Sequence, residues 1–179
     1  FGLAARSDSS WIVVYGSSST YRTVNYSIYN ASGTLITSSS FVCANGYSTG
    51  YYVGNCSATT LSDGTTFVLG YIMLGASGTG YQINFRQLPT GNVLGSENYI
   101  PYQNVPSNSF ATITLQSLAS GNFAVVACGY GVYNGYNIQY AVFNSSNVCL
   151  SGTYGSYGTS TNALPKIFNA ALYTITVLS

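Results

Sequence analysis

The sequence has almost no charged side chains and no histidine. Only 4% of its 179 residues are Asp, Glu, Lys or Arg, giving four cations, three anions and a formal net charge of +1, whereas ordinary soluble domains carry roughly 25%. Four scattered cations cannot form the basic patch that proteins use to bind nucleic acid. Without histidine there is no Ser-His-Asp triad and no His-ligated metal site. Three carboxylates leave little material for acid–base catalysis or for glycoside hydrolysis. We therefore expect no enzymatic activity, no cofactor, no metal and no nucleic-acid partner.

Long apolar runs are also missing. The longest, Phe67–Leu74, is far shorter than the roughly 20 residues that cross a bilayer, so we expect no membrane span.

The chain begins with Phe1 in place of Met and carries no targeting segment, which indicates a processed or trimmed N-terminus.

Uncharged polar and aromatic residues fill the composition, with 26 Ser, 18 Thr, 16 Asn, 18 Tyr and 8 Phe. A surface built this way has little charge to keep copies apart. This composition favours covalent glycans, assembly into a polymer, or both, and low carboxylate content would also suit an acid habitat. It predicts a secreted protein located outside the cell or at the cell surface.

Four cysteines are present: Cys43, Cys56, Cys128 and Cys149. None lies in a CxxC pair, and an even count in such a chain predicts disulfides formed in an oxidising compartment. Of the three possible pairings we favour the sequence-local one, Cys43–Cys56 with Cys128–Cys149. Buried free thiols are the alternative.

An internal repeat organises the chain. Trp11, Phe67 and Phe123 each follow a turn and open an apolar run, and they are evenly spaced, since 67 − 11 = 56 and 123 − 67 = 56. Each run leads through a loop to an alternating run, a turn and a last short strand, around Leu35, Val93 and Val148. These patterns predict a single all-β domain, residues 1–179. Its four-stranded repeats cover about 1–54, 55–108 and 109–160, and two further strands lie within 162–179.

The repeat pattern combines a turn with Asp-Gly or Ser-Gly, an aromatic-apolar run, Gly-Tyr-x-Ile and Gly-x-x-Leu-Gly, best seen in residues 61–94 and 118–143. It resembles tandem repeats of large secreted bacterial surface proteins, which implies β-propeller-like blades. Propellers have four to eight blades. Three repeats and two further strands amount to three and a half blades, which do not close a ring easily, so a β-trefoil and a β-sandwich remain alternatives. The composition is similar to that of extracellular pilus and thread filament subunits of microbes.

Four Asn-x-Ser sequons mark candidate glycosylation sites: Asn25, Asn30, Asn55 and Asn144. Asn30 and Asn144 fall at equivalent turns, where exposure is expected.

The few acidic residues have simple structural interpretations. Asp8 and Asp63 occupy matching turns, where an Asp side chain hydrogen-bonds its own backbone, and Glu97 is isolated in the sequence. Tyrosines in probable loops, namely Tyr51, Tyr52, Tyr130, Tyr133 and Tyr136, could stack on sugars, but packing is the stronger interpretation.

The C-terminal segment Lys166–Leu178 has alternating residues typical of a half-buried strand. Its candidate pairing residues are Ile167, Tyr173, Ile175 and Val177. The segment could complete the first repeat of its own chain or insert into a neighbouring subunit, and we favour the neighbour. These features predict a non-enzymatic structural subunit of a glycosylated extracellular filament or surface layer, a homopolymer joined by strand pairing. A secreted carbohydrate-binding or adhesin module is the alternative.

Overall fold

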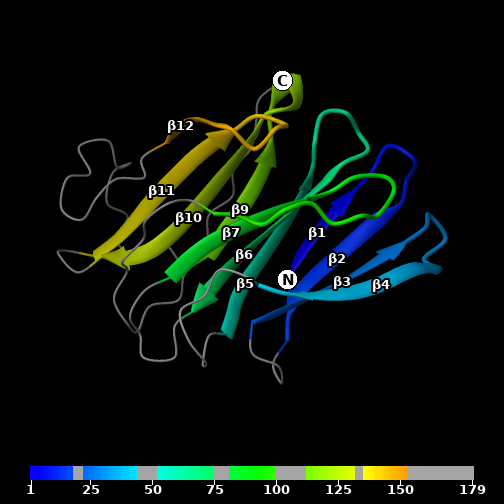
Figure 1. Ribbon diagram of the computed structural model, residues 1–179, viewed down its shortest axis with the longest axis horizontal. Helices are drawn as coiled ribbons and strands as arrows, with labels where there is room; N and C mark the ends of the chain where they lie inside the picture. The colour runs from blue at the N-terminus through cyan, green and yellow to red at the C-terminus, as the bar shows by residue number, and fades with distance from the viewer. Residues whose placement is uncertain (18–21, 44–51, 75–80, 100–111, 132–134, 153–179) are drawn as a thin grey trace.

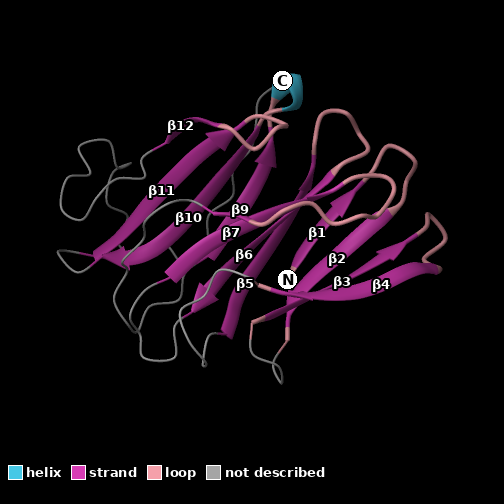
Figure 2. Ribbon diagram, in the orientation of Figure 1, coloured by secondary structure: helices cyan, strands magenta, loops and turns pink. Residues whose placement is uncertain are grey.

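The computed structural model describes residues 1–17, 22–43, 52–74, 81–99, 112–131 and 135–152, which form three antiparallel sheets of four strands each (Figure 1, Figure 2). The first sheet contains β1 (Gly2–Ala5), β2 (Trp11–Gly16), β3 (Thr23–Tyr29) and β4 (Leu35–Val42). The second contains β5 (Tyr52–Thr60), β6 (Phe67–Leu74), β7 (Tyr81–Leu88) and β8 (Asn98–Tyr99). The third contains β9 (Thr112–Ser117), β10 (Phe123–Gly131), β11 (Gly135–Phe143) and β12 (Cys149–Gly152), with a short 3-10 helix, η1 (Ala119–Gly121), between β9 and β10. The predicted all-β class is confirmed.

Each sheet corresponds to one predicted repeat. Trp11, Phe67 and Phe123 each begin the second strand of their sheet, as their spacing predicted. Within every sheet the strands pair in chain order as a meander, and the second sheet lies between the first and the third (Figure 1). Three stacked meanders differ from the two facing sheets of a β-sandwich. The second sheet begins with Tyr52, three residues before the boundary expected at residue 55.

The fourth strands differ most from expectation. β4 begins at Leu35, but Val93 lies in the connection between β7 and β8 and is 76% exposed. In that connection the Gly95 N–H donates to the Gln87 carbonyl at 2.8 Å. Strand pairing resumes only at Asn98, because the connection is longer than the equivalent turns of the other two sheets.

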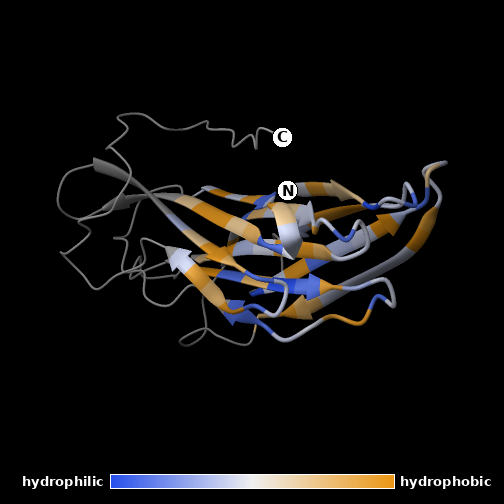
Figure 3. Cartoon of the chain, turned by 90° about the horizontal axis from the view of Figure 1, so that it is seen from above, coloured by the Kyte–Doolittle hydropathy of each residue, from blue (hydrophilic) through white to orange (hydrophobic). Residues whose placement is uncertain are grey.

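Alternation along the strands gives every sheet two faces (Figure 3). In the second and third sheets, we call the face toward the preceding sheet the upstream face and the opposite face the downstream face. The faces of the first sheet take the names of the equivalent faces of the other two. On the second strands the upstream-face residues are Trp11, Val13 and Tyr15, then Phe67, Leu69 and Tyr71, then Phe123, Val125 and Ala127. Because the repeat is 56 residues long, these three sets occupy equivalent positions.

Apolar clusters fill the two junctions between sheets. At the first junction the downstream face of the first sheet meets the upstream face of the second, and its fully buried members include Ile12, Val14, Val24, Phe67, Leu69 and Met73. At the second junction Phe85 packs against the rings of Phe123 and Phe143, with centroid distances of 5.3 and 4.6 Å. Burial of each such side chain stabilises the fold by about 1.5–3 kcal/mol.

Close approach of the sheets requires glycine at specific positions. A Cβ on Gly2 of β1 would lie 2.4 Å from the carbonyl carbon of Ser57 in β5. At the second junction a Cβ on Gly70 would lie 2.9 Å from Cδ1 of Ile113. Any larger residue at Gly2 would therefore push the first and second sheets apart, because the atom it meets belongs to the backbone.

Candidate functional site

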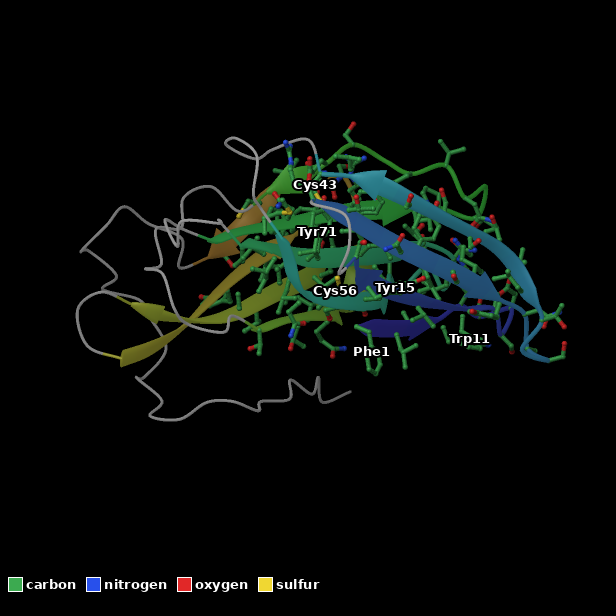
Figure 4. All side chains as sticks on the ribbon, turned by 90° about the horizontal axis from the view of Figure 1, so that it is seen from below. Phe1, Trp11, Tyr15, Cys43, Cys56 and Tyr71 are labelled. Atoms are coloured by element: carbon green, nitrogen blue, oxygen red, sulfur yellow. The ribbon has the colours of Figure 1, made fainter. Side chains whose placement is uncertain are left out.

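The main group of buried ionisable side chains in the described residues lies where the first and second sheets meet. The Tyr71 hydroxyl donates to Oε1 of Glu97 at 2.5 Å, and Nη2 of Arg86 lies 3.7 Å from Oε2 of the same carboxylate. The Arg86 guanidinium also stacks over the ring of Phe41, 4.8 Å from its centroid. Cys43 follows β4 on the same side (Figure 4). The cluster joins β4 of one sheet to β6, β7 and the segment before β8 of the next.

The electrostatics of this cluster do not suit catalysis at neutral pH. Burial raises the pKa of the Cys43 thiol to about 12, and the nearby Glu97 carboxylate adds to the effect. Burial also raises the pKa of Tyr71 above its usual range, with Cys43 and Glu97 contributing further. A catalytic acid, base or nucleophile needs a pKa near the working pH. Both pKa values move away from neutrality. The contact of Arg86 with Phe41 joins the second sheet to the first, so the cluster links the two sheets.

Glu97 is isolated in the sequence, with no second carboxylate to work with, and the structure gives it two partners of other kinds, Tyr71 and Arg86. No sequence signal could have found them, because Tyr71, Arg86 and Glu97 come from different strands of the second sheet and the segment beside it. Asn84 lies beside Tyr71 in the strand register and is fully buried, and neither polar atom of its side chain has a hydrogen-bond partner. A buried polar group without a hydrogen-bond partner lowers the stability of the folded state by about 1–3 kcal/mol.

The cysteines differ from the expected disulfides. Cys43, Cys56 and Cys149 are free cysteines in the structure, so the favoured Cys43–Cys56 bond is not formed, nor is one from Cys149 to Cys128. The side chain of Cys128 lies outside the described residues. Cys43 and Cys56 are both buried in the apolar cluster of the first junction. Burial raises the pKa of Cys56 to about 12 as well. These two residues correspond to the alternative of buried thiols.

Arg6 connects the β1–β2 turn to the β7–β8 connection. Its Nη2 donates to the carbonyls of Leu88 and Pro89 at 3.1 and 3.0 Å, and the guanidinium stacks 4.1 Å above the ring centroid of Phe67. Burial lowers the pKa of Arg6 from its usual value, partly offset by Asp8 and Asp63. This cation therefore acts as a bridge across the first junction.

The turn aspartates behave as predicted. Oδ1 of Asp8 accepts from the amide and hydroxyl of Ser10, at 2.9 and 2.6 Å. Oδ1 of Asp63 accepts from the amides of Thr65 and Thr66 at 2.7 and 2.9 Å. In the described residues no group of three or more His, Cys, Asp or Glu side chains gathers to hold a metal ion.

Asn30 and Asn144 lie at the β3–β4 and β11–β12 turns, which are built alike. Oδ1 of Asn30 accepts from the amides of Ser32 and Thr34 at 3.0 and 2.9 Å. Oδ1 of Asn144 accepts from the equivalent amides at 3.0 and 2.9 Å. Each turn ends in a residue with positive φ, which is Gly33 in the first turn and is typical of a type I turn with a bulge. The Asn-x-Ser pattern at both turns therefore has a structural role whether or not a glycan is attached.

The other two sequons lie within strands. Asn25 is in β3, half-buried, and is the cross-strand partner of Tyr15. Asn55 is in β5, also half-buried, at an irregularity in the pairing with β6.

Other candidate residues cannot be placed. Tyr51, Tyr133 and the whole segment Lys166–Leu178, with Ile167, Tyr173, Ile175 and Val177, lie outside the described residues. The side chains of Tyr52, Tyr130 and Tyr136 are likewise not described, although their backbones belong to β5, β10 and β11. Within the described ranges the chain has no helix long and apolar enough to cross a membrane.

The upstream face of the first sheet is apolar on β1 and β2 and polar on β3, which contributes Asn25 and Ser27. No other described sheet covers it. Leu3 and Tyr15 are 55% and 43% exposed, and Trp11 and Val13 are half-buried. Trp11 stacks on Tyr29 with ring centroids 4.4 Å apart and donates from Nε1 to the Asn30 carbonyl. In Figure 4, Phe1, Trp11 and Tyr15 all lie on the first sheet, apart from Cys43 and Tyr71.

The comparisons with known proteins give no family. The sequence matches no protein family model and no curated protein. The fold is similar to a solved structure of a single-residue mutant of Synechocystis apocarotenoid oxygenase, with a TM-score of 0.47 and 12% identity. The match covers 81% of this chain and 36% of that protein. A likeness at this level carries no argument about function.

Proposed function

We propose that this chain is a non-enzymatic structural subunit of a glycosylated extracellular filament or surface layer, in which copies associate by β-strand pairing. The observation that carries the proposal is the edge strand β4. It pairs with β3 and with no other described strand, and six of its eight residues are exposed. It contains neither a charged residue nor a proline, the devices that normally protect an edge from another strand.

The strand that pairs with such an edge is provided by the segment Lys166–Leu178 of a neighbouring copy. Ile175 and Val177 alternate with Thr174 and Thr176, so one face of the added strand is apolar and the other polar. Main-chain hydrogen bonds supply affinity in this mode of recognition, and the alternating side chains supply specificity.

Glycans at the exposed turns complete the proposal. The β3–β4 and β11–β12 turns hold Asn30 and Asn144, each half-buried where full exposure was expected, beside exposed residues. A chain with four cations and three anions has little charge repulsion to keep it dispersed. Sugars at these turns would hydrate the surface around them and prevent association there. N-linked sugars at these sites would require a secretory route, which agrees with a location outside the cell or at its surface.

Electron microscopy tests the strand-pairing function. The full chain should form regular filaments, and a chain ending at Thr161 should not, while keeping its fold by circular dichroism. Ile175→Lys should abolish filaments because it places a charge on the apolar face of the donated strand. Thr176→Lys, the matched control, places the same charge on the polar face and should leave filaments intact. Filaments of normal geometry from the shortened chain would refute strand donation.

A carbohydrate-binding or adhesin module is the second candidate, and the stacked Trp11–Tyr29 pair favours it. Aromatic rings with one accessible side can stack on sugar rings. Titration of the monomeric protein with a panel of oligosaccharides would test this role. Binding that is lost in Trp11→Ala, without filaments from the wild-type protein, would support the module and not the subunit.

A further inference from the structure

We infer that the upstream face of the first sheet packs against the downstream face of the third sheet of a second copy, forming a junction like the two inside the chain. The inference rests on the proposed self-assembly. It adds a second contact to the strand pairing at the edge, in which whole sheet faces pack against each other.

The repeat equivalence is the first step of the argument. Phe67, Leu69 and Tyr71 are fully buried at the first junction, and Phe123, Val125 and Ala127 are at most 5% exposed at the second. Trp11, Val13 and Tyr15 occupy the same positions of the first sheet, one repeat length upstream. They keep the same apolar and aromatic character, yet Tyr15 is 43% exposed. The residues suit a junction whose other half is not among the described sheets.

The strand β1 extends the apolar part of this face, because Leu3 pairs with Val13. The strands β3 and β4 add an uncharged polar part, in which Asn25 and Ser27 pair with Tyr15 and Val13 and with two serines of β4. The face carries no charged residue along these strands. A second sheet can therefore cover it without burying an unpaired charge, which is the costliest fault in an interface.

The complementary surface follows from the same rule. At both internal junctions an upstream face meets a downstream face, whose second-strand residues are Ile12 and Val14 in the first sheet and Val68 and Ile72 in the second. Ala124 is the equivalent residue of the third sheet, and its cross-strand partner is Val142. Both are half-buried, whereas Val126, the next residue of β10 on this face, is only 8% exposed. Ala124 and Val142 therefore mark the part of this face that a second copy can still reach. The third sheet of a second copy thus offers the type of face that the first sheet lacks.

This contact joins two different surfaces, so it is head-to-tail. Such contacts close into rings when the rotation permits and otherwise extend as filaments. Two copies would bring together six sheets, which is within the four to eight blades that propellers contain.

Sedimentation velocity over a range of concentrations tests the contact with matched variants. Leu3→Lys and Tyr15→Lys place a charge on the upstream face, and each should weaken self-association by about tenfold or more. Val93→Lys makes the same kind of change at a loop residue that is 76% exposed, and it should associate as the wild type does. Circular dichroism and thermal unfolding establish that the variants fold.

A photo-crosslinking amino acid at Tyr15 identifies what covers the face without adding charge. In a mixture of ¹⁴N- and ¹⁵N-labelled protein, crosslinked peptides should join two copies and contain Ala124 or Val142. Crosslinks confined to one chain, reaching residues 162–179, would overturn the inference and show that the chain covers its own first sheet. Assembly unaffected by Leu3→Lys and Tyr15→Lys would overturn this contact alone. A wild-type protein that stays monomeric would overturn the proposed function as well.

Discussion

The charged residues of this chain show, one by one, how a protein with so few charges uses them. Six of the seven lie in the described residues, and each has an intramolecular contact: Arg6, Asp8, Arg22, Asp63, Arg86 and Glu97. Lys166 is outside the described residues. The charged side chains therefore stabilise turns and the junctions between sheets.

Asp63 is one of two turn carboxyls whose pKa is lowered in the folded chain, so we expect it to contribute to the pH dependence of stability. Burial alone would raise the pKa of this carboxyl, but the hydrogen bonds from Thr65 and Thr66 outweigh it and the pKa is lowered. The stabilisation is present above the pKa of about 3.9 that Asp has in an unfolded chain, and it is lost as the pH falls through the lower folded value. Urea unfolding at pH 7 and at about pH 2.5 should show a smaller loss of stability in Asp63→Asn than in the wild type. Equal losses would contradict this role.

The thiols provide a second test at this scale. Because the thiolate is the reactive form, the raised pKa values of Cys43 and Cys56 predict slow alkylation of the folded protein by iodoacetamide. Unfolding in urea without reductant should make both react rapidly, with mass spectrometry as the readout. Unfolded protein in which neither residue reacts before reduction would restore the predicted disulfide.

At the scale of strands and turns, the sequence predicted best those features that neighbouring residues determine by themselves. The aromatic residues at 56-residue intervals marked the start of β2, β6 and β10, and the Asn turns followed from hairpin rules. The position of β8 could not be predicted, because Gly95 pairs with Gln87 before the strand resumes. The Tyr71–Glu97–Arg86 cluster could not be predicted either, since it depends on which strands the meander places side by side.

The β3–β4 turn separates the structural role of its asparagine from glycosylation. Asn30→Ala removes the acceptor of the Ser32 and Thr34 amides and should lower the free energy of unfolding by about 1 kcal/mol in protein made without glycans. Asn30→Asp, the control, keeps a carboxylate oxygen in place and should retain most of that stability. Equal stability of the wild type and Asn30→Ala would show that the turn does not need this side chain.

The same pair of variants bears on the glycan. Both remove the acceptor nitrogen, so peptide mass spectrometry of protein from its native source should find sugar on wild-type Asn30 and none on either variant. Unmodified Asn30 and Asn144 in the wild type would leave their turn geometry as the full explanation of the Asn-x-Ser pattern.

At the scale of the whole molecule, the chain is a series of equivalent sheets that make the same contact twice. The turns before β2, β6 and β10 are joined in series as well: the Ser7 amide donates to the Gly64 carbonyl at 2.8 Å, and the Gly121 amide donates to Oγ of Ser62 at 2.8 Å. A repeated contact of this kind can continue beyond one chain as readily as within it.

The position of Asn25 beside Tyr15 adds a consequence for growth. A sugar on Asn25 and a sheet packed over Tyr15 would occupy the same space, because the two residues are cross-strand partners on one face. A copy glycosylated at Asn25 could therefore offer its third sheet to a partner but accept none on its first. In the proposed assembly it would act as a chain stopper, and the fraction of such copies would set the length that the assembly reaches.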